Sequence, residues 1–194
     1  MKFGKRPRTE IRSPHELQLL QRAQAMEPAK PPNPWAAGVV VPAAGCTACG
    51  WDQEEHLVLI SSSGYSVTQL GTGQLLHRNR DADATEAGMG PDGLTFRIPH
   101  DGQLITIFGY EAGDGIRLTN DGWMLEVIYP WWPRASVVLD NVFRQGYEYL
   151  KDAVMLDLSR LDGSVKCGFS PSGRHFVVLG SGGALLNSRA ADGS

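Results

Sequence analysis

Two stretches of this chain of 194 residues share one pattern, and this repeat constrains the fold more than any other feature. The first stretch reads Cys-Gly-Trp-Asp from Cys49 and continues, three residues later, with His56, four apolar residues and a Ser/Gly turn. The second reads Cys-Gly-Phe-Ser from Cys167 and continues, after a turn, with His175, four apolar residues and a Gly/Ser turn. When one inserted residue is allowed, the two stretches have the same types of residue in the same order. We therefore expect a duplicated strand–turn–strand unit.

Each copy of this unit is expected to form a hairpin. The aromatic residue, Trp51 or Phe169, ends the first strand, and the Ser-Pro-Ser-Gly segment 170–173 is typical of a tight turn. The returning strand 176–179 is continuously apolar, which indicates a strand that is buried on both faces.

The rest of the chain also favours short strands. Gly and Pro make up 35 of the 194 residues, about 18% against an average usage near 12%, so turns are frequent. The polar segment 81–93 is expected to be a loop, and 147–158 is open between an amphipathic helix and a crossover strand. The pattern predicts a mainly β fold of antiparallel hairpins, either a compact sandwich or a partial propeller. The expected strands cover 39–41, 57–61, 65–70, 75–78, 94–98, 104–108, 116–119, 123–129, 136–139, 165–169, 175–179 and 184–187.

The second copy, with Phe-Ser-Pro-Ser-Gly-Arg-His over 169–175, resembles the blade motif of WD40-type β-propellers. The first copy continues through 65–74 in a way that is similar to the later strands of such a blade. The Trp-Asp pair that closes those blades is missing at its usual place. This partial resemblance implies blade-like hairpins and no particular activity. The Cys-Gly boxes and the central Asp-Gly-Trp at 121–123 also look similar to an uncharacterised bacterial protein family, which implies a shared fold only.

Residues 1–34 differ in composition from the body, 35–194. They hold seven Lys/Arg against three Asp/Glu, a net charge of +4, whereas the body holds eleven against eighteen, a net charge of -7. Ser13 as N-cap, Pro14 at the first helical position and Glu16 three residues after the cap predict a short helix over 13–26. A Pro-rich linker follows. We therefore expect a flexible basic arm in front of one all-β domain.

Charge and hydropathy exclude several classes of partner. The formal net charge of the chain is -3, so contact with nucleic acid is expected only through the arm residues Lys2, Lys5, Arg6 and Arg8. No apolar run approaches the roughly 18 residues that a bilayer span needs, and no apolar segment follows the charged N-terminus as in a secretory signal. The expected location is the cytoplasm, without a membrane partner.

The cysteines are weak candidates for a metal or redox site. Cys46 and Cys49 have the spacing of half a zinc site or of a redox pair, and Cys167 could contribute a further ligand. The equivalent repeat positions of Cys49 and Cys167 favour buried core residues instead. We therefore expect neither a metal nor a cofactor.

Histidines and carboxylates show no familiar catalytic motif. His56 and His175 occupy equivalent positions of the repeat, which a role in the fold explains more simply than catalysis. Acidic side chains gather in turn-like stretches, where solvated loops are the simpler interpretation. A hydrolase whose groups meet only in the fold stays open as a hypothesis. The acidic residues in question are Asp52, Glu54, Glu55, Asp81, Asp83 and Glu86.

An aromatic segment is the best candidate for a binding surface. Trp123, Tyr129 and Trp131 share one face of a strand by its period of two, and Trp132 points the other way. Exposed Trp and Tyr side chains are common anchors of protein interfaces, and they also stack on sugars. Arg134 could extend such an interface, whereas burial of the aromatics against the sheet is the alternative.

These observations favour a non-enzymatic protein-binding module, such as a bacterial inhibitor, immunity-type or adaptor protein. An acidic body would suit a basic protein partner through charge complementarity. One alternative is a carbohydrate or small-ligand binding domain that uses Trp123, Trp131 and Trp132 as stacking platforms. The other is a hydrolase whose site is assembled only in the fold.

Overall fold

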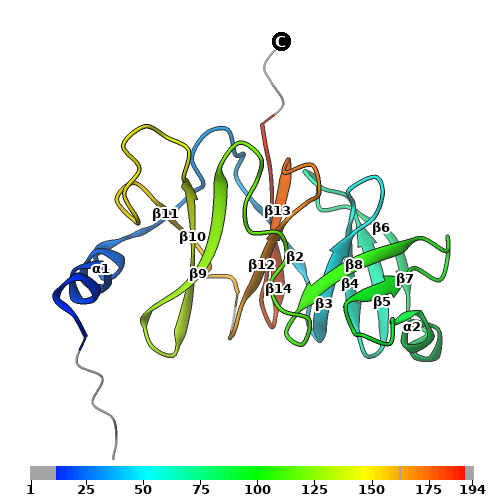
Figure 1. Ribbon diagram of the computed structural model, residues 1–194. Helices are drawn as coiled ribbons and strands as arrows, with labels where there is room; N and C mark the ends of the chain where they lie inside the picture. Colours follow the sequence, from blue (N-terminus) through cyan, green and yellow to red (C-terminus); the bar gives the residue numbers. More distant parts are fainter. Residues whose placement is uncertain (1–11, 162, 191–194) are drawn as a thin grey trace, which may run out of the picture.

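The computed structural model of the chain describes residues 12–161 and 163–190. Their strands form three sheets, which confirms the predicted mainly β fold of antiparallel hairpins (Figure 1). The curled sheet has the order β6-β5-β4-β3-β8-β7, the central sheet β12-β13-β14-β2, and the helix-side sheet β1-β11-β10-β9.

The elements have the following bounds. The curled sheet contains β3 (Cys46–Trp51), β4 (Leu57–Ser61), β5 (Gly64–Thr68), β6 (Leu75–Asn79), β7 (Thr95–Arg97) and β8 (Leu104–Gly109). The central sheet contains β2 (Val39–Pro42), β12 (Lys166–Phe169), β13 (His175–Leu179) and β14 (Gly183–Ser188). The helix-side sheet contains β1 (Pro28–Ala29), β9 (Trp123–Trp131), β10 (Arg134–Asn141) and β11 (Val154–Leu156). The helices are α1 (Pro14–Ala25) and α2 (Ala82–Gly88).

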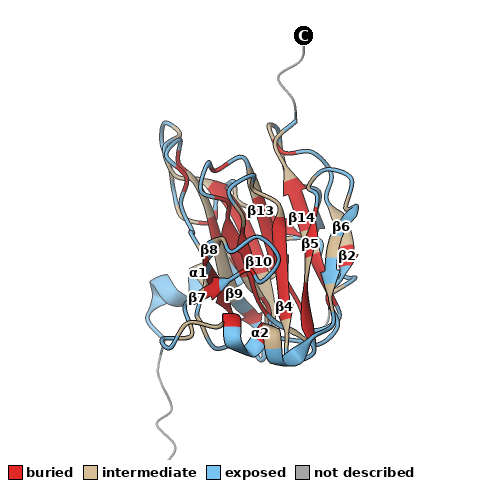
Figure 2. Cartoon of the chain, turned by 90° about the vertical axis from the view of Figure 1, so that its right-hand side faces the viewer, coloured by how far each residue is buried: buried red, intermediate tan, exposed pale blue. Residues whose placement is uncertain are grey.

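The central sheet is buried on both faces. In β13, Val177 and Leu179 point into a core shared with the curled sheet, whereas Phe176 and Val178 point into a core shared with the helix-side sheet. All four side chains are fully buried, which agrees with their continuously apolar sequence. Figure 2 shows the buried residues concentrated in the strands, β13 and β4 among them.

The two copies of the repeat have the same strand register. Cys49 pairs with Leu59 in the first copy, and Cys167 pairs with Val178 in the second. In each copy the cysteine and the aromatic face one core and the glycine between them faces the other. At Gly168 a Cβ atom would lie 2.8 Å from a backbone Cα of the connection between β8 and β9, so a side chain does not fit there. This contact explains the glycine of the second copy.

Residues from the N-terminal side complete two of the sheets. β2 pairs with β14 in the central sheet, and β1 pairs in parallel with β11 in the helix-side sheet. The predicted helix is present as α1, with the Ser13 and Glu16 capping box, and its buried Ala23 packs against Val138 and Met155. Residues 12–34 therefore pack onto the body. The basic arm residues Lys2, Lys5, Arg6 and Arg8 lie outside the described residues.

Three segments differ from the sequence-based expectation. Within 81–93, expected to be a loop, Asp81 caps the helix α2 by accepting a hydrogen bond from a backbone amide of its first turn. Segment 116–119 is not a strand, because it makes only single bridges, one from Ile116 to the central sheet and one from Leu118 to the helix-side sheet. Segment 147–158 consists of turns followed by β11. None of the helices in the described ranges is long and apolar enough to cross a membrane.

Arg189 ties the end of the central sheet to the turn before β9. Its guanidinium donates hydrogen bonds of 2.8 and 2.7 Å to the two carboxylate oxygens of Asp121, and its Nε donates to the Gly173 carbonyl at 3.0 Å. The guanidinium carbon also lies 5.0 Å from the ring centre of Trp35. The hydrogen bonds from Arg189 lower the pKa of Asp121 to about 2.

This pair predicts a pH dependence of stability. Because the folded pKa of Asp121 lies below its ordinary value of 3.8, the stabilisation is complete above that value and is lost as the pH falls towards 2. The Asp121→Asn variant should therefore be less stable than the wild type at pH 5, and the difference should shrink as the pH falls. The effect is small because Asp121 is half exposed and solvent screens the pair. Urea unfolding at pH 5 to 2.5 measures it, and a difference that stays constant with pH would contradict this assignment.

Candidate functional site

The hairpin β9–β10 carries exposed aromatic side chains at its tip. Trp131 and Arg134 form the last pair of the hairpin. The exposed fractions are 46% for Tyr129, 56% for Trp131 and 80% for Trp132. We call Tyr129, Trp131, Trp132 and Arg134 the aromatic tip, which lies at the lower edge of the view in Figure 1.

The aromatic tip lies beyond the part of β9 that packs in the core. Leu125 and Val127 of β9 pack in the core between the helix-side and central sheets. The register of the hairpin shifts between the pairs Ile128–Ser136 and Trp131–Arg134, so the alternation of faces is interrupted before Trp131. Tyr129 and Trp131 extend past the buried region and are exposed. The Tyr129 and Trp132 rings contact each other at 5.4 Å between centres, with an angle of 54° between their planes. The tip is thus an uncovered end of a sheet face.

Trp123, predicted on the same face, is not part of the tip. It begins β9, eight positions before Trp131, which corresponds to roughly 26 Å along the strand. Its half-buried ring packs edge-on against Trp35, with 5.9 Å between the ring centres. The register shift before Trp131 also means that the predicted shared face does not extend from Trp123 to Trp131. Trp123 belongs to the core region and the other aromatics do not.

A shallow groove of about 260 Å³ adjoins the tip, between α1 and β9. Tyr129 of the tip also lines the groove, so the two surfaces are continuous. The side-chain amide of Gln24 donates a 2.9 Å hydrogen bond to the carbonyl of Pro130 and thereby fixes α1 beside the tip. Glu16 is the charged member of the lining, and the other lining residues are Leu19, Leu20, Ala23, Ile128, Pro130, Tyr149 and Leu150.

The equivalent turns of the two repeat copies meet through Glu55. Its carboxylate accepts hydrogen bonds from the backbone amide of Ser172 at 2.7 Å and from its hydroxyl at 2.6 Å. His175 lies between Glu55 and Ser188. Its Nε2 is 3.7 Å from a carboxylate oxygen of Glu55, and its Nδ1 is 2.8 Å from the Oγ of Ser188. Burial lowers the pKa of His175, with the Glu55 charge opposing this effect. The fold therefore brings a serine, a histidine and a carboxylate into one row.

This row has structural roles that account for its members. Both carboxylate oxygens of Glu55 already accept hydrogen bonds from Ser172. In the first copy, Asp52 accepts hydrogen bonds from the backbone amides of Glu54 and His56, and the His56 ring lies 3.0 Å from its second oxygen. These residues line neither the groove beside α1 nor a larger cavity between β2 and strands β4 to β6. Asp83 and Glu86 are exposed on α2.

A second histidine pair was not visible in the sequence. The Tyr65 hydroxyl lies 3.0 Å from Nδ1 of His100 and 3.4 Å from Nε2 of His77. The two imidazole rings stack with 4.1 Å between their centres. Since β6 carries His77 and the turn after β7 carries His100, only the curl of the sheet brings them together, and no local spacing could have indicated it.

The three cysteines occupy different environments. Cys49 and Cys167 are fully buried, whereas Cys46 is half-buried. Burial raises the pKa of Cys167 to about 12 and raises that of Cys49 further above its usual range. Among residues 12–161 and 163–190, no group of three or more His, Cys, Asp or Glu side chains is placed to hold a metal ion.

These environments predict how the thiols react. Because the thiolate is the reactive form, the two buried thiols with raised pKa should be inert in the folded protein. A disulfide reagent such as Ellman's reagent should titrate one thiol, Cys46, in the native protein and all three thiols in guanidinium chloride. The Cys46→Ser variant should show no reactive thiol when folded. Two or more rapidly reacting thiols in the native wild type would contradict the described core.

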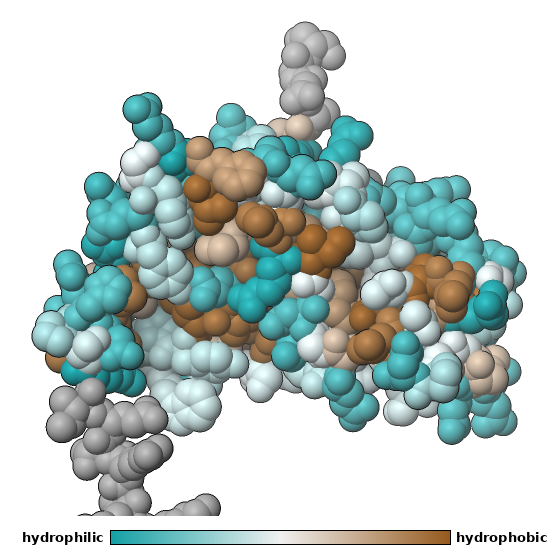
Figure 3. All heavy atoms as spheres, viewed as in Figure 1, coloured by the Kyte–Doolittle hydropathy of each residue, from teal (hydrophilic) through white to brown (hydrophobic). Residues whose placement is uncertain are grey.

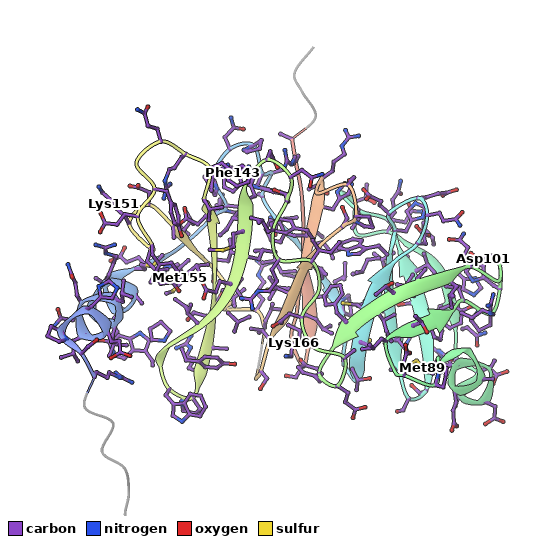
Figure 4. All side chains as sticks on the ribbon, viewed as in Figure 1. Met89, Asp101, Phe143, Lys151, Met155 and Lys166 are labelled. Carbon is purple, nitrogen blue, oxygen red and sulfur yellow. The ribbon has the colours of Figure 1, made fainter. Side chains whose placement is uncertain are left out.

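An apolar patch lies at the opposite end of the β9–β10 hairpin from the aromatic tip. Ile116 and Leu118, on the connection between β8 and β9, are about half exposed, and Phe143 is 65% exposed. Figure 3 shows hydrophobic atoms gathered over this connection. Figure 4 places Phe143 at the upper edge, at the opposite end of β10 from the tip. This patch provides a control surface for experiments on the tip.

In comparisons with protein-family models, with curated proteins and with solved structures, nothing matches this chain.

Proposed function

We propose that the protein is a non-enzymatic binding protein of the inhibitor, immunity or adaptor kind, and that it contacts a protein partner through the aromatic tip. The observation that carries this proposal is the exposure of Trp131 and Trp132 together at the end of a hairpin. Large aromatic side chains are enriched among the residues that dominate interface energies. Keeping two of them in water is unfavourable, and a covering partner would remove that cost.

The partner that fits best has a basic surface with apolar side chains. Glu16 is the charged residue of the groove beside the tip, and residues 35–194 carry a net charge of -7. Complementary charge would speed encounter with a basic protein, while the tip and the groove would supply buried apolar area. The tilted contact between Tyr129 and Trp132, 54° between the ring planes, gives less support to a sugar platform, for which coplanar open faces would be favourable.

Quantitative co-purification tests this proposal. The tagged wild type, the double variant Trp131→Ala/Trp132→Ala and the control Phe143→Ala are purified from the native host, after equal melting temperatures show that all three fold. We expect a stoichiometric protein with the wild type and with Phe143→Ala, and its loss with the double variant. The proposal is overturned if no protein co-purifies in stoichiometric amount, or if the double variant retains it.

A further inference from the structure

A second cavity, of about 500 Å³, lies between the edge strand β2 of the central sheet and strands β4 to β6 of the curled sheet. This volume is in the range of pockets that enclose small organic ligands, about 300–1,000 Å³. Its walls combine apolar and hydroxyl side chains with two arginines and no carboxylate. The polar lining includes Ser61, Ser63, Ser66, Thr68, Asn79, Arg78 and Arg80, and the apolar lining includes Val41, Leu59 and Leu75.

The strand register turns the arginines towards this cavity. Arg78 pairs with Ser66 across β6 and β5, and Ser66 pairs with Leu59 across β5 and β4. Leu59 faces the central sheet, so Arg78 lies on the same face of the curled sheet. Arg80 follows two positions later and lines the same cavity. Both arginines therefore belong to the lining of one cavity.

Neither guanidinium is neutralised within the fold. Across residues 12–161 and 163–190, Arg78 and Arg80 form no hydrogen bond or ion pair through their side chains. By contrast, Arg22, Arg144 and Arg189 each hold a carboxylate. Arg78 and the Cys46 thiol line the same cavity. Burial raises the pKa of this thiol, and the Arg78 charge opposes that rise. Both arginines are exposed to solvent, and they line the same cavity without a carboxylate beside them.

We propose that this cavity binds a small organic anion, with a phosphate or carboxylate group held by Arg78 and Arg80 and an apolar part against Leu59 and Leu75. A guanidinium presents paired N–H donors that match the oxygens of a phosphate or a carboxylate. The hydroxyl of Ser66, beside Arg78, can donate a further hydrogen bond to the same group. This site lies away from the aromatic tip and does not depend on the proposed protein partner.

The thiol of Cys46 provides a direct readout, because it lines the cavity while the other two cysteines are buried. The rate at which N-ethylmaleimide modifies Cys46 is measured by mass spectrometry in the presence of phenyl phosphate, phenylacetate or uncharged benzyl alcohol. We expect at least one of the two anions to slow modification in a saturable manner and benzyl alcohol to have no effect. The anion that protects Cys46 at the lower concentration indicates whether the site prefers a phosphate or a carboxylate group.

Two variants and a control complete the test. In Arg78→Gln/Arg80→Gln, and separately in Arg80→Gln, the protecting anion should bind at least about 10-fold more weakly. Arg80 follows the last residue of β6, so its single substitution leaves the strand unchanged. The exposed Arg160 lies outside the cavity lining, and Arg160→Gln should retain full protection. The proposal is overturned if neither anion protects Cys46, if benzyl alcohol protects it equally, or if protection is unchanged in the arginine variants.

Discussion

Replacement of Phe176 by alanine is expected to lower the free energy of unfolding by about 3–5 kcal/mol. Phe176 is fully buried in β13, in the core between the central and helix-side sheets. Its ring centre lies 4.9 Å from that of Trp35 and 5.8 Å from that of Phe169. The substitution leaves a cavity between two stacked sheets that cannot collapse without moving both. For a protein with a typical stability of about 5–15 kcal/mol, this loss is a large fraction.

Chemical and thermal denaturation measure the effect of Phe176→Ala. A loss of this size corresponds to a fall in melting temperature of roughly 6–20 °C for a chain of this length. The matched control is Phe143→Ala, in which the same substitution is made at an exposed position and should cost less than about 1 kcal/mol. Equal effects of the two substitutions would show that the central sheet is not buried as described.

Replacement of both tip tryptophans is expected to weaken partner binding by about 1,000-fold, with little change in stability. Buried tryptophans at interface centres commonly contribute about 2 kcal/mol or more each, and every 1.4 kcal/mol corresponds to a factor of ten. Trp131 and Trp132 are more than half exposed in the free chain, so their removal takes little apolar area out of the core. Calorimetric titration of the double variant against the co-purified partner gives the Kd, and a change below tenfold would contradict this assignment.

Local patterns in the sequence were sufficient for the repeat and for most strands. The continuously apolar run 176–179 and the Ser-Pro-Ser-Gly turn before it predicted a strand buried on both faces, as β13 is. The repeat also predicted a hairpin for each copy, and Cys49 and Cys167 occupy equivalent positions in the two hairpins. The capping box of α1 was also predictable, because Ser13 and Glu16 are only three positions apart.

Long-range contacts were beyond such patterns. β2 pairs with β14, more than a hundred positions away, and no local signal specifies that partner. Segment 116–119 has strand-like composition, but it crosses between two sheets. It makes a single bridge to each of them and so forms no strand. No local pattern indicated that Trp123 packs against Trp35 while Trp131 stays exposed. The helix α2 could have been predicted from the sequence, because Asp81 is a good N-cap. It was missed because its polar composition is also typical of a loop.

Of the candidate sites, one was predictable from a local pattern and the other depends on long-range contacts. The aromatic tip was found in the sequence, because tryptophans close to a turn are a local signal. The cavity at Arg78 and Arg80 was missed, because Arg78 lies in β6 and Arg80 just beyond its end, and no local pattern marks a cavity there. What the sequence could not indicate was that β2 would form the opposite wall and that the fold would supply no carboxylate for either guanidinium.

Contact at the aromatic tip is the central claim, and hydroxyl-radical footprinting of the co-purified complex tests it most directly. In the free protein, Trp131, Trp132 and Phe143 should all be oxidised, because each is more than half exposed. In the complex, oxidation of Trp131 and Trp132 should fall several-fold while that of Phe143 is unchanged. Protection of Phe143 with both tryptophans still fully oxidised would contradict the account and assign the interface to the apolar patch instead.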